Sequence, residues 1–295
     1  MRGQVPECRV EVPASLEEAL QWLAREPGQW RPLAGGTDLM VPFAAGRLAD
    51  TRFLSLHRLD ELRTLDVDAT SLTFGALVTY TQVRAAAEVH AHLPNLSASA
   101  AATGALAIQN RGTLGGNLVN ASPAADTPPA LLAYAAEVEL TSLRGSRWLP
   151  YAAFHTGYKQ TVLATDELLT RIRVPKPAVG GFHFYRKVGT RAAQAVAKVC
   201  VAAYARVDQG ILAEFRLGLG SVAPVPTRAP RTEAVLLGQA LGALPVKAAR
   251  EALWADLSPI DDLRSTAHYR HTIAGNVLEQ LLGELAGQRW SAGQR

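Results

Sequence analysis

The chain has 295 residues, of which 48% are hydrophobic and 19% are charged, and its formal net charge is +4. These values are close to those of globular proteins and exclude a mainly disordered chain, while the scattered basic residues, with no run of five, exclude an ordinary nucleic-acid-binding module. Two cysteines are too few for a disulfide framework or an iron–sulfur cluster, and no uncharged apolar run reaches the roughly 18 residues of a membrane span, so a cytoplasmic protein is expected.

The first 50 residues predict a β-α-β arrangement. "CRVEV" (8–12) is a short strand, and Ser15 with Glu18 forms a capping box at the start of the amphipathic helix "LEEALQWLAR" (16–25). "WRPLAGGTDLMVPF" then runs from a strand into a glycine turn. A helix is expected from about residue 39, capped by Thr37 or Asp38, and Pro42 predicts that it is short.

The middle of the chain mixes helices and strands. Two alternating segments around residues 68–71 predict a β-hairpin, and helices are expected at about 79–89 and 95–108. The segment "NRGTLGGNLVNASPAADTPPA" (110–130) is predicted as a loop, followed by a helix near 126–135 that two prolines help to start. Strands are expected in "EVELTSL", "SRWLP" and "DELLTRIRVP" (137–143, 146–150 and 166–175), so the fold class is α+β.

The prolines and glycines of residues 175–181 predict the clearest boundary in the chain. Beyond it, strands are expected at 182–188, 194–207 and 211–225, with a hairpin turn at Asp208-Gln209-Gly210. Helices are expected at about 231–240, 245–255 and 265–286.

Two glycine-bearing segments, "AGGTD" (34–38) and "GTLGGN" (112–117), carry the strongest local indication of a ligand site. Neither matches the G-x-G-x-x-G of a Rossmann turn or the Gly-Lys-Ser/Thr of a P-loop. Glycines let backbone N–H groups approach an oxyanion, and neutral donors without lysine favour a bound diphosphate, such as that of a dinucleotide, over a transferred phosphoryl group. Taken singly, each segment is equally typical of an ordinary tight turn.

Asp126 and the histidines leave alternatives open. The Asp126 carboxylate is placed to accept hydrogen bonds from sugar or ribityl hydroxyls, or to cap the helix of "TPPALLAY". The pairs His90/His92 and His268/His271 lack a third ligand, so they are expected to be solvated helix residues rather than a metal site. No sequence motif of a hydrolase, of C-x-x-C chemistry or of H-E-x-x-H chemistry is present, and no catalytic residue is predicted.

Five longer motifs, in order, resemble the FAD-binding (medium) subunit of the molybdenum hydroxylases, the family of xanthine dehydrogenase and carbon monoxide dehydrogenase. They are "LAGGTDLMV", "QNRGTLGGNLVNASPAADTPPALLAYAAEVEL", "FHTGYKQTVLATDELLTRIRVP", "VAPVPTRAPRTEAVLLG" and "DDLRSTAHYRHTIAGNVLEQLL". The resemblance covers nearly the whole chain.

This resemblance implies a fold and a domain organisation. It implies an FAD-binding domain of the vanillyl-alcohol oxidase (PCMH) type over residues 1–176, with two subdomains at about 1–55 and 56–176. A C-terminal flavoprotein domain, a three-stranded antiparallel sheet with helices, would follow over residues 181–290. The FAD diphosphate would lie between the two glycine loops.

The resemblance also implies which residues contact FAD. Thr103 and Leu168 match positions that line the adenine, Asp126 matches an acidic residue that holds FAD hydroxyls, and Lys187 matches a cation near the isoalloxazine. For Lys187 a solvated strand lysine is the alternative. The complete set of implied FAD-binding residues is Leu33, Ala34, Gly35, Gly36, Thr37, Asp38, Leu39, Thr103, Thr113, Gly115, Gly116, Asn117, Asp126, Leu168 and Lys187.

Related subunits work in hetero-oligomers, so partner chains are implied. A [2Fe-2S] small subunit would supply electrons to the FAD, and a molybdopterin large subunit would oxidise the substrate, with NAD⁺ or another compound as final acceptor. "HTGYKQT" is more similar to the xanthine dehydrogenase branch than to the carbon monoxide dehydrogenase branch, which stays the alternative. Two other hypotheses remain: a self-contained flavin oxidoreductase, and a scaffold that has lost its flavin.

Overall fold

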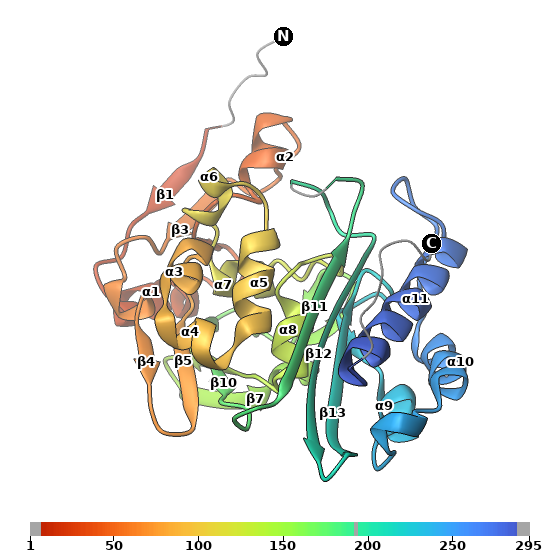
Figure 1. The fold of residues 1–295 in the computed structure, drawn as a ribbon. Coiled ribbons are helices and arrows are strands. Elements are labelled where there is room, and N and C mark those ends of the chain that lie inside the picture. The colour runs from red at the N-terminus through yellow and green to blue at the C-terminus, as the bar shows by residue number, and fades with distance from the viewer. Residues whose placement is uncertain (1–6, 192–193, 288–295) are drawn as a thin grey trace.

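The computed structural model describes residues 7–191 and 194–287, which form three larger sheets and one two-stranded sheet. Figure 1 shows the larger sheets with helices between and outside them. This mixture is the predicted α+β class. The expected domain ends at residues 1–6 and 288–290 lie outside the described residues. Within the described ranges no helix is both long and apolar enough to cross a bilayer, and the cytoplasmic location stays a prediction.

The first sheet is parallel, with the order β1-β3-β2, and consists of β1 (Arg9–Glu11), β2 (Arg31–Leu33) and β3 (Arg52–Ser55). Helix α1 (Leu16–Arg25) begins as predicted, since the Ser15 hydroxyl accepts the Glu18 N–H at 3.2 Å. The predicted cap of the next helix by Thr37 or Asp38 is wrong. Helix α2 (Met40–Ala44) has no side-chain cap, because the Gly36 carbonyl already accepts the Met40 N–H at 2.9 Å and the turn starts upstream.

The second sheet is antiparallel, with the order β4-β5-β10-β6-β7. Its strands are β4 (Leu65–Val67), β5 (Ser71–Gly75), β6 (Glu137–Ser142), β7 (Gly145–Pro150) and β10 (Leu168–Pro175). The hairpin at 68–71 is confirmed, and Asp68 closes it by accepting hydrogen bonds from Thr70 and Ser71, which hold the pKa of Asp68 well below its ordinary value. A small hairpin of β8 (His155–Gly157) and β9 (Gln160–Thr161) was not predicted.

Six helices fill the space beside this sheet. They are α3 (Tyr80–Ala85), α4 (Ala87–His92), α5 (Pro94–Ala102), α6 (Leu106–Gln109), α7 (Leu114–Val119) and α8 (Pro128–Ala133), and three 3₁₀ turns lie at Asp60–Leu62, Tyr151–Ala153 and Leu241–Ala243. The expected helices 79–89 and 95–108 are each divided in two, because Ala86 is extended and Gly104 has φ +57°. Helix α7 lies inside the segment that was predicted to be a loop.

The third sheet is antiparallel, with the order β11-β12-β13-β14. The predicted strands appear as β11 (Phe182–Val188), β12 (Val199–Asp208) and β13 (Ile211–Gly220), and the two-residue β14 (Thr227–Arg228) extends the edge. Gln209 and Gly210 both have positive φ, +49° and +77°, as a tight hairpin turn requires. The last helices are α9 (Pro230–Leu236), α10 (Val246–Asp256) and α11 (Ala267–Leu285), and α9 ends earlier than predicted, before Gly238 with φ +79°.

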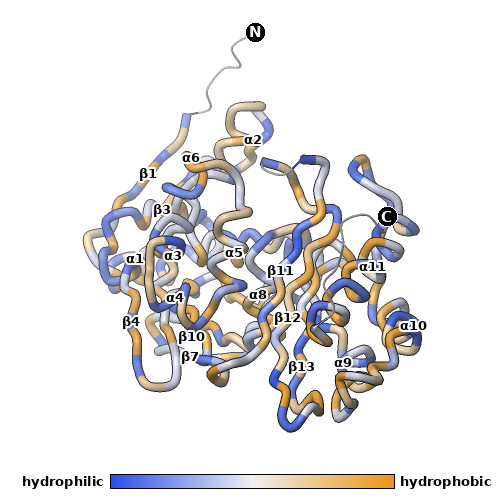
Figure 2. The backbone as a smooth tube through the Cα atoms, in the orientation of Figure 1, coloured by the Kyte–Doolittle hydropathy of each residue, from blue (hydrophilic) through white to orange (hydrophobic). Residues whose placement is uncertain are grey.

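Helices cover both faces of this sheet. Helices α5 and α8 contact one face, and α9 and α11 contact the other (Figure 1), so β12 is buried over most of its length and apolar in Figure 2. Helix α8 lies directly on the backbone of β13. A Cβ atom at Gly218 would come within 2.1 Å of the Pro129 carbonyl oxygen, and one at Gly220 within 3.2 Å of Pro129 Cγ.

Candidate functional site

The two glycine loops are in contact. A Cβ atom placed on Gly35 would lie 1.8 Å from the Arg111 carbonyl oxygen, and a Cβ atom on Gly116 would lie 3.8 Å from Ala34 Cβ. Gly35 does not have a positive φ, so here glycine is required by the close approach of the other backbone. The residues at 34–39 and 112–117, far apart in sequence, therefore form one site.

The first loop exposes unused backbone donors. Within the described ranges, the N–H groups of residues 34–39 donate to no other residue, and Gly36 turns the chain with φ +74°. Unpaired N–H groups need an acceptor, and a row of them in a glycine turn is the arrangement that binds phosphate oxygens. This loop has the donors that a diphosphate requires.

In the second loop, most backbone N–H groups already donate to other protein groups. Thr113 is the N-cap of α7, and its hydroxyl accepts the Gly116 N–H at 3.1 Å, while the Gly115 N–H donates to the Ala76 carbonyl at 2.9 Å. A Cβ atom at Gly115 would lie 2.6 Å from Ala76 Cβ, so glycine serves packing at this position. The Asn117 side-chain oxygen accepts a hydrogen bond from the Thr127 hydroxyl.

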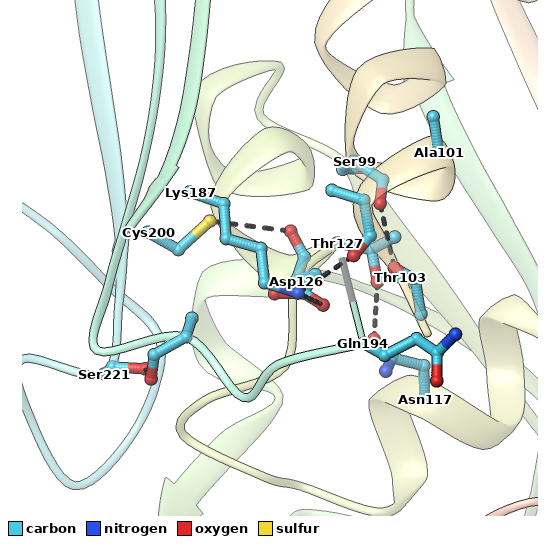
Figure 3. A network of polar contacts seen from close by, with 12 residues as sticks. Ser99, Ala101, Thr103, Asn117, Asp126, Thr127, Lys187, Gln194, Cys200 and Ser221 are labelled. Carbon is cyan, nitrogen blue, oxygen red and sulfur yellow. Dashed lines mark hydrogen bonds and ion pairs between the residues drawn. The ribbon is translucent and has the colours of Figure 1, made fainter. Parts of the chain in front are cut away.

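Asp126 and Lys187 form a buried ion pair (Figure 3). Lys187 Nζ lies 2.6 Å from Asp126 Oδ2 and 2.9 Å from the Ala102 carbonyl oxygen, and the two charged side chains are only 10% and 11% exposed. Burial raises the pKa of Asp126 to about 6, and the Lys187 ammonium partly offsets this effect. The expected cap of α8 by Asp126 is absent, and the alternative of a solvated Lys187 is wrong.

The other oxygen of the Asp126 carboxylate has no hydrogen-bond partner. Asp126 Oδ1 is buried and unpaired among the described residues, whereas the Asp126 main-chain oxygen accepts the Tyr185 hydroxyl at 3.1 Å. Because an orphaned buried acceptor is costly, it indicates a donor that binds there. A sugar or ribityl hydroxyl of a dinucleotide fits this requirement, so the residues present suit FAD.

Thr103 and Leu168 belong to different elements of the fold. Thr103 follows α5, one residue after the carbonyl that Lys187 contacts, and its hydroxyl donates to the Ser99 carbonyl at 2.8 Å. Leu168 begins β10 and is buried in the hydrophobic cluster that Ala34 of the first loop packs against. Both residues therefore border segments of the site, from different elements.

Sequence reasoning missed several polar partners. Tyr185 and Cys200 from the third sheet line the Asp126 segment, and burial raises the pKa of the Cys200 thiol to about 12. Tyr185 could have been found, since it stands two residues before Lys187 and strand periodicity places both on one face. Cys200 is buried, whereas Cys8 is partly exposed. Among the described residues, no group of three or more His, Cys, Asp or Glu side chains is arranged to hold a metal ion.

Comparisons with known proteins identify the family of the chain. Residues 6–177 match a family model described as "FAD binding domain in molybdopterin dehydrogenase", and residues 183–285 match "CO dehydrogenase flavoprotein C-terminal domain". The xanthine dehydrogenase FAD-binding subunit of Escherichia coli O157:H7 is 33% identical, over 92% of this chain and 93% of the relative. The carbon monoxide dehydrogenase medium chain of Hydrogenophaga pseudoflava is 30% identical, over 94% and 96% of the two chains.

Solved structures are similar as well. A carbon monoxide dehydrogenase structure from Hydrogenophaga pseudoflava matches with a TM-score of 0.90 and 29% identity, over 94% of this chain and 96% of that one. Quinoline 2-oxidoreductase from Pseudomonas putida 86 matches with a TM-score of 0.88 and 26% identity, over 96% and 98%. The chain belongs to the FAD-binding medium subunits of the molybdenum hydroxylase family of oxidoreductases.

Proposed function

We propose that FAD lies between residues 33–39 and 113–117, with its diphosphate on the N–H groups of the first loop. The single observation that supports this best is the row of N–H groups at 34–39 that find no acceptor in the part of the chain that the structure describes, in a loop that contacts the second loop through Gly35. Hydrogen bonds from such donors to a charged acceptor are worth about 1.5–3 kcal/mol each. Several together suffice for non-covalent retention of a cofactor.

The remaining residues of the site would orient the cofactor. Asp126 Oδ1 would accept a cofactor hydroxyl, Thr103 and Leu168 would line the adenine, and Lys187 would stand near the isoalloxazine. Bound FAD supplies a ring that takes up and releases electrons, and a nearby ammonium stabilises negative charge on the ring. Asp126 Oδ2 and the Ala102 carbonyl oxygen hold Lys187 Nζ in position.

The proposed role of the chain is electron transfer within a complex. Its relatives are named as subunits or medium chains of dehydrogenases and hydroxylases. We propose a [2Fe-2S] small subunit as electron donor, a molybdopterin large subunit as the site of substrate oxidation, and NAD⁺ as acceptor. The matched ranges 6–177 and 183–285 support the proposed division into domains at residues 176–181.

Reconstitution tests FAD binding directly. Purified chain incubated with FAD and desalted should keep yellow flavin absorbance, which bleaches on reduction. Gly116→Val should lose it, because its side chain would enter the space between Thr113 and Ala34, whereas Gly242→Val, where nothing lies within 4 Å of the added Cβ, should keep it. Wild-type chain that stays colourless would contradict the proposal.

A xanthine-type substrate is proposed for the complex. The identity to the Escherichia coli xanthine dehydrogenase subunit, 33%, and the segment "HTGYKQT" support this choice over carbon monoxide. Affinity purification of the chain from its native host should recover an iron–sulfur chain and a large molybdopterin chain. The complex should reduce NAD⁺ with a purine, and reduction with carbon monoxide instead would select the alternative.

A further inference from the structure

Ser221 holds an unusual backbone conformation behind the site. It directly follows β13, is buried, and has φ +67°, in the left-handed region that side chains other than glycine rarely adopt. Such strain persists where the surroundings fix it, and it gathers at functional sites. The contacts of Ser221 identify what fixes it.

All three polar groups of Ser221 are engaged, each with a different segment. Its N–H donates to the Pro123 carbonyl at 2.7 Å, its hydroxyl donates to the Ala197 carbonyl at 2.9 Å, and its carbonyl accepts Arg270 Nη1 at 2.7 Å. These partners belong to the Asp126 segment, the approach to β12 and helix α11. Ser221 therefore connects three segments of the chain by hydrogen bonds at one end of the third sheet.

Arg270 reaches Ser221 from α11, on the face of the third sheet that α9 and α11 cover. Only 4% of it is exposed, and besides Ser221 it donates to the Lys198 carbonyl at 3.1 Å and to Asp262 Oδ1 at 2.8 Å. Asp262 is itself held by the N–H groups of Arg264 and Ser265, at 2.8 and 3.0 Å. A guanidinium buried and paired in this way is fixed in position.

The contacts of Ser221 and Arg270 are connected through the backbone to both Asp126 and Lys187. Pro123 stands three residues before Asp126, and the Lys198 N–H donates at 2.8 Å to the carbonyl of Val188, the neighbour of Lys187. In Figure 3 Ser221 and Cys200 flank the Asp126 segment on the side of the third sheet. Ser221 thus contacts the Asp126 segment directly, and Arg270 is linked to the Lys187 segment through Lys198.

We propose that Ser221 and Arg270 are positioning residues, which hold the Asp126 segment against β11 and so set the geometry of the Asp126–Lys187 pair. The purpose of the pair rests on the proposed FAD site, but the positioning itself does not require FAD. The competing explanation is that both residues only close the end of the third sheet.

Hydrogen exchange of the chain without FAD tests the positioning. In Ser221→Ala and Arg270→Lys, amides of residues 120–127 and 186–188 should exchange faster than in wild type. Arg250→Lys is the matched control, because Arg250 ties α10 to α11 through Asn276 and Glu279, away from the ion pair. Equal exchange of these segments in Ser221→Ala, Arg270→Lys and the control would overturn the proposal.

Flavin binding provides the second readout. We expect FAD to bind about tenfold more weakly to Arg270→Lys and roughly fivefold more weakly to Ser221→Ala, because binding must then order the loosened Asp126 segment. The flavin midpoint potential should fall, since a displaced Lys187 stabilises the reduced ring less, whereas Arg250→Lys should change neither quantity. Affinities and potentials equal to those of the control would contradict the proposal.

The experiments distinguish a failure of the positioning proposal from a failure of the proposed FAD site. Wild-type chain that binds no FAD would refute the proposed function, and hydrogen exchange would still decide the positioning. If Arg270→Lys does not fold, Ser221→Ala decides alone, because it removes the hydroxyl bond to Ala197 that helps to hold the left-handed backbone from which the Ser221 N–H reaches Pro123.

Discussion

The two glycine loops have similar compositions but opposite structures. In residues 34–39 the backbone donors have no partner among residues 7–191 and 194–287, and Gly36 turns the chain through a positive φ. In residues 112–117 the chain forms the capped start of α7, and Gly115 fits against Ala76. The comparison teaches that glycine at Gly35 and Gly115 makes room for a neighbouring backbone or side chain in both loops, whereas the two loops differ in how many backbone donors they leave available.

The strongest test of this comparison is Gly35→Ala, at the contact between the loops. The added Cβ would overlap the Arg111 carbonyl oxygen, and since that oxygen is backbone, the loops must separate. We expect a loss of about 3 kcal/mol in unfolding free energy, measured with urea, and no retained FAD after desalting. Gly242→Ala adds a Cβ in open space and should behave as wild type; equal flavin content in the two variants would refute the contact.

Gly115→Ala tests the second loop by itself. Its Cβ would lie 2.6 Å from Ala76 Cβ and 2.7 Å from the Ala76 carbonyl oxygen, so the FAD-free chain should lose about 1–3 kcal/mol of unfolding free energy. The folded fraction should bind FAD better than Gly35→Ala does. Stability unchanged by Gly115→Ala would break the comparison, because the second loop would then not be supported by packing.

The pH dependence of FAD affinity tests Asp126, which the Thr127–Asn117 contact ties to the second loop. The Asp126 pKa of about 6 lies above the ordinary value of about 3.9, so the folded chain protonates this carboxyl as the pH falls through 6. A neutral acid accepts hydrogen bonds more weakly than a carboxylate, and FAD should bind about fivefold more weakly at pH 5 than at pH 7.5. Isothermal titration should show this slope flattened in Asp126→Asn.

The same shift has the opposite sign for the stability of the FAD-free chain. Because the raised pKa means that the folded state binds this proton more tightly, the ionised Asp126 lowers stability above pH 6, and this cost disappears as the pH falls toward 4. The difference in unfolding temperature between wild type and Asp126→Asn should therefore change between pH 4 and 6. A difference that is constant over this range would contradict the assignment.

The smallest expected effect concerns the cap of α7. Thr113→Ala removes the hydroxyl that accepts the Gly116 N–H and should cost about 1 kcal/mol of unfolding free energy. Thr113→Ser keeps a hydroxyl at this position and should recover most of the loss. Thermal unfolding of the two variants measures the difference, and identical melting temperatures would show that the cap does not stabilise the loop.

Local sequence patterns predicted much of the fold but few of the side-chain contacts within the site. β11 has the predicted bounds, and the turn at Gln209 and Gly210 was also predicted, because alternation and turn residues are local properties. Helix α7 was missed because two glycines have low helix propensity, which the contact with Ala76 overrides. The Asp126–Lys187 pair joins residues 61 positions apart, and no periodicity indicates such a contact.

The resemblance to a family supplied what local patterns could not. It implied that Asp126, Lys187 and the two loops all contact FAD, and the structure pairs Asp126 with Lys187 and brings the two loops into contact. It gave no indication of Ser221, whose left-handed backbone depends on partners from three segments. Long-range contacts between backbone groups are therefore the part of the site that sequence reasoning lacks.

The contact of α8 with Gly218 and Gly220 has a consequence for how the chain melts. Helix and strand meet there without intervening side chains, and Tyr204 of β12 is buried in the core of the second sheet. Because the second and third sheets share buried side chains in this way, the parts of the chain that carry them should unfold cooperatively. Calorimetry should show a single endotherm, and a fragment ending near residue 180 should be insoluble or molten, since it would expose the surface that β13 covers.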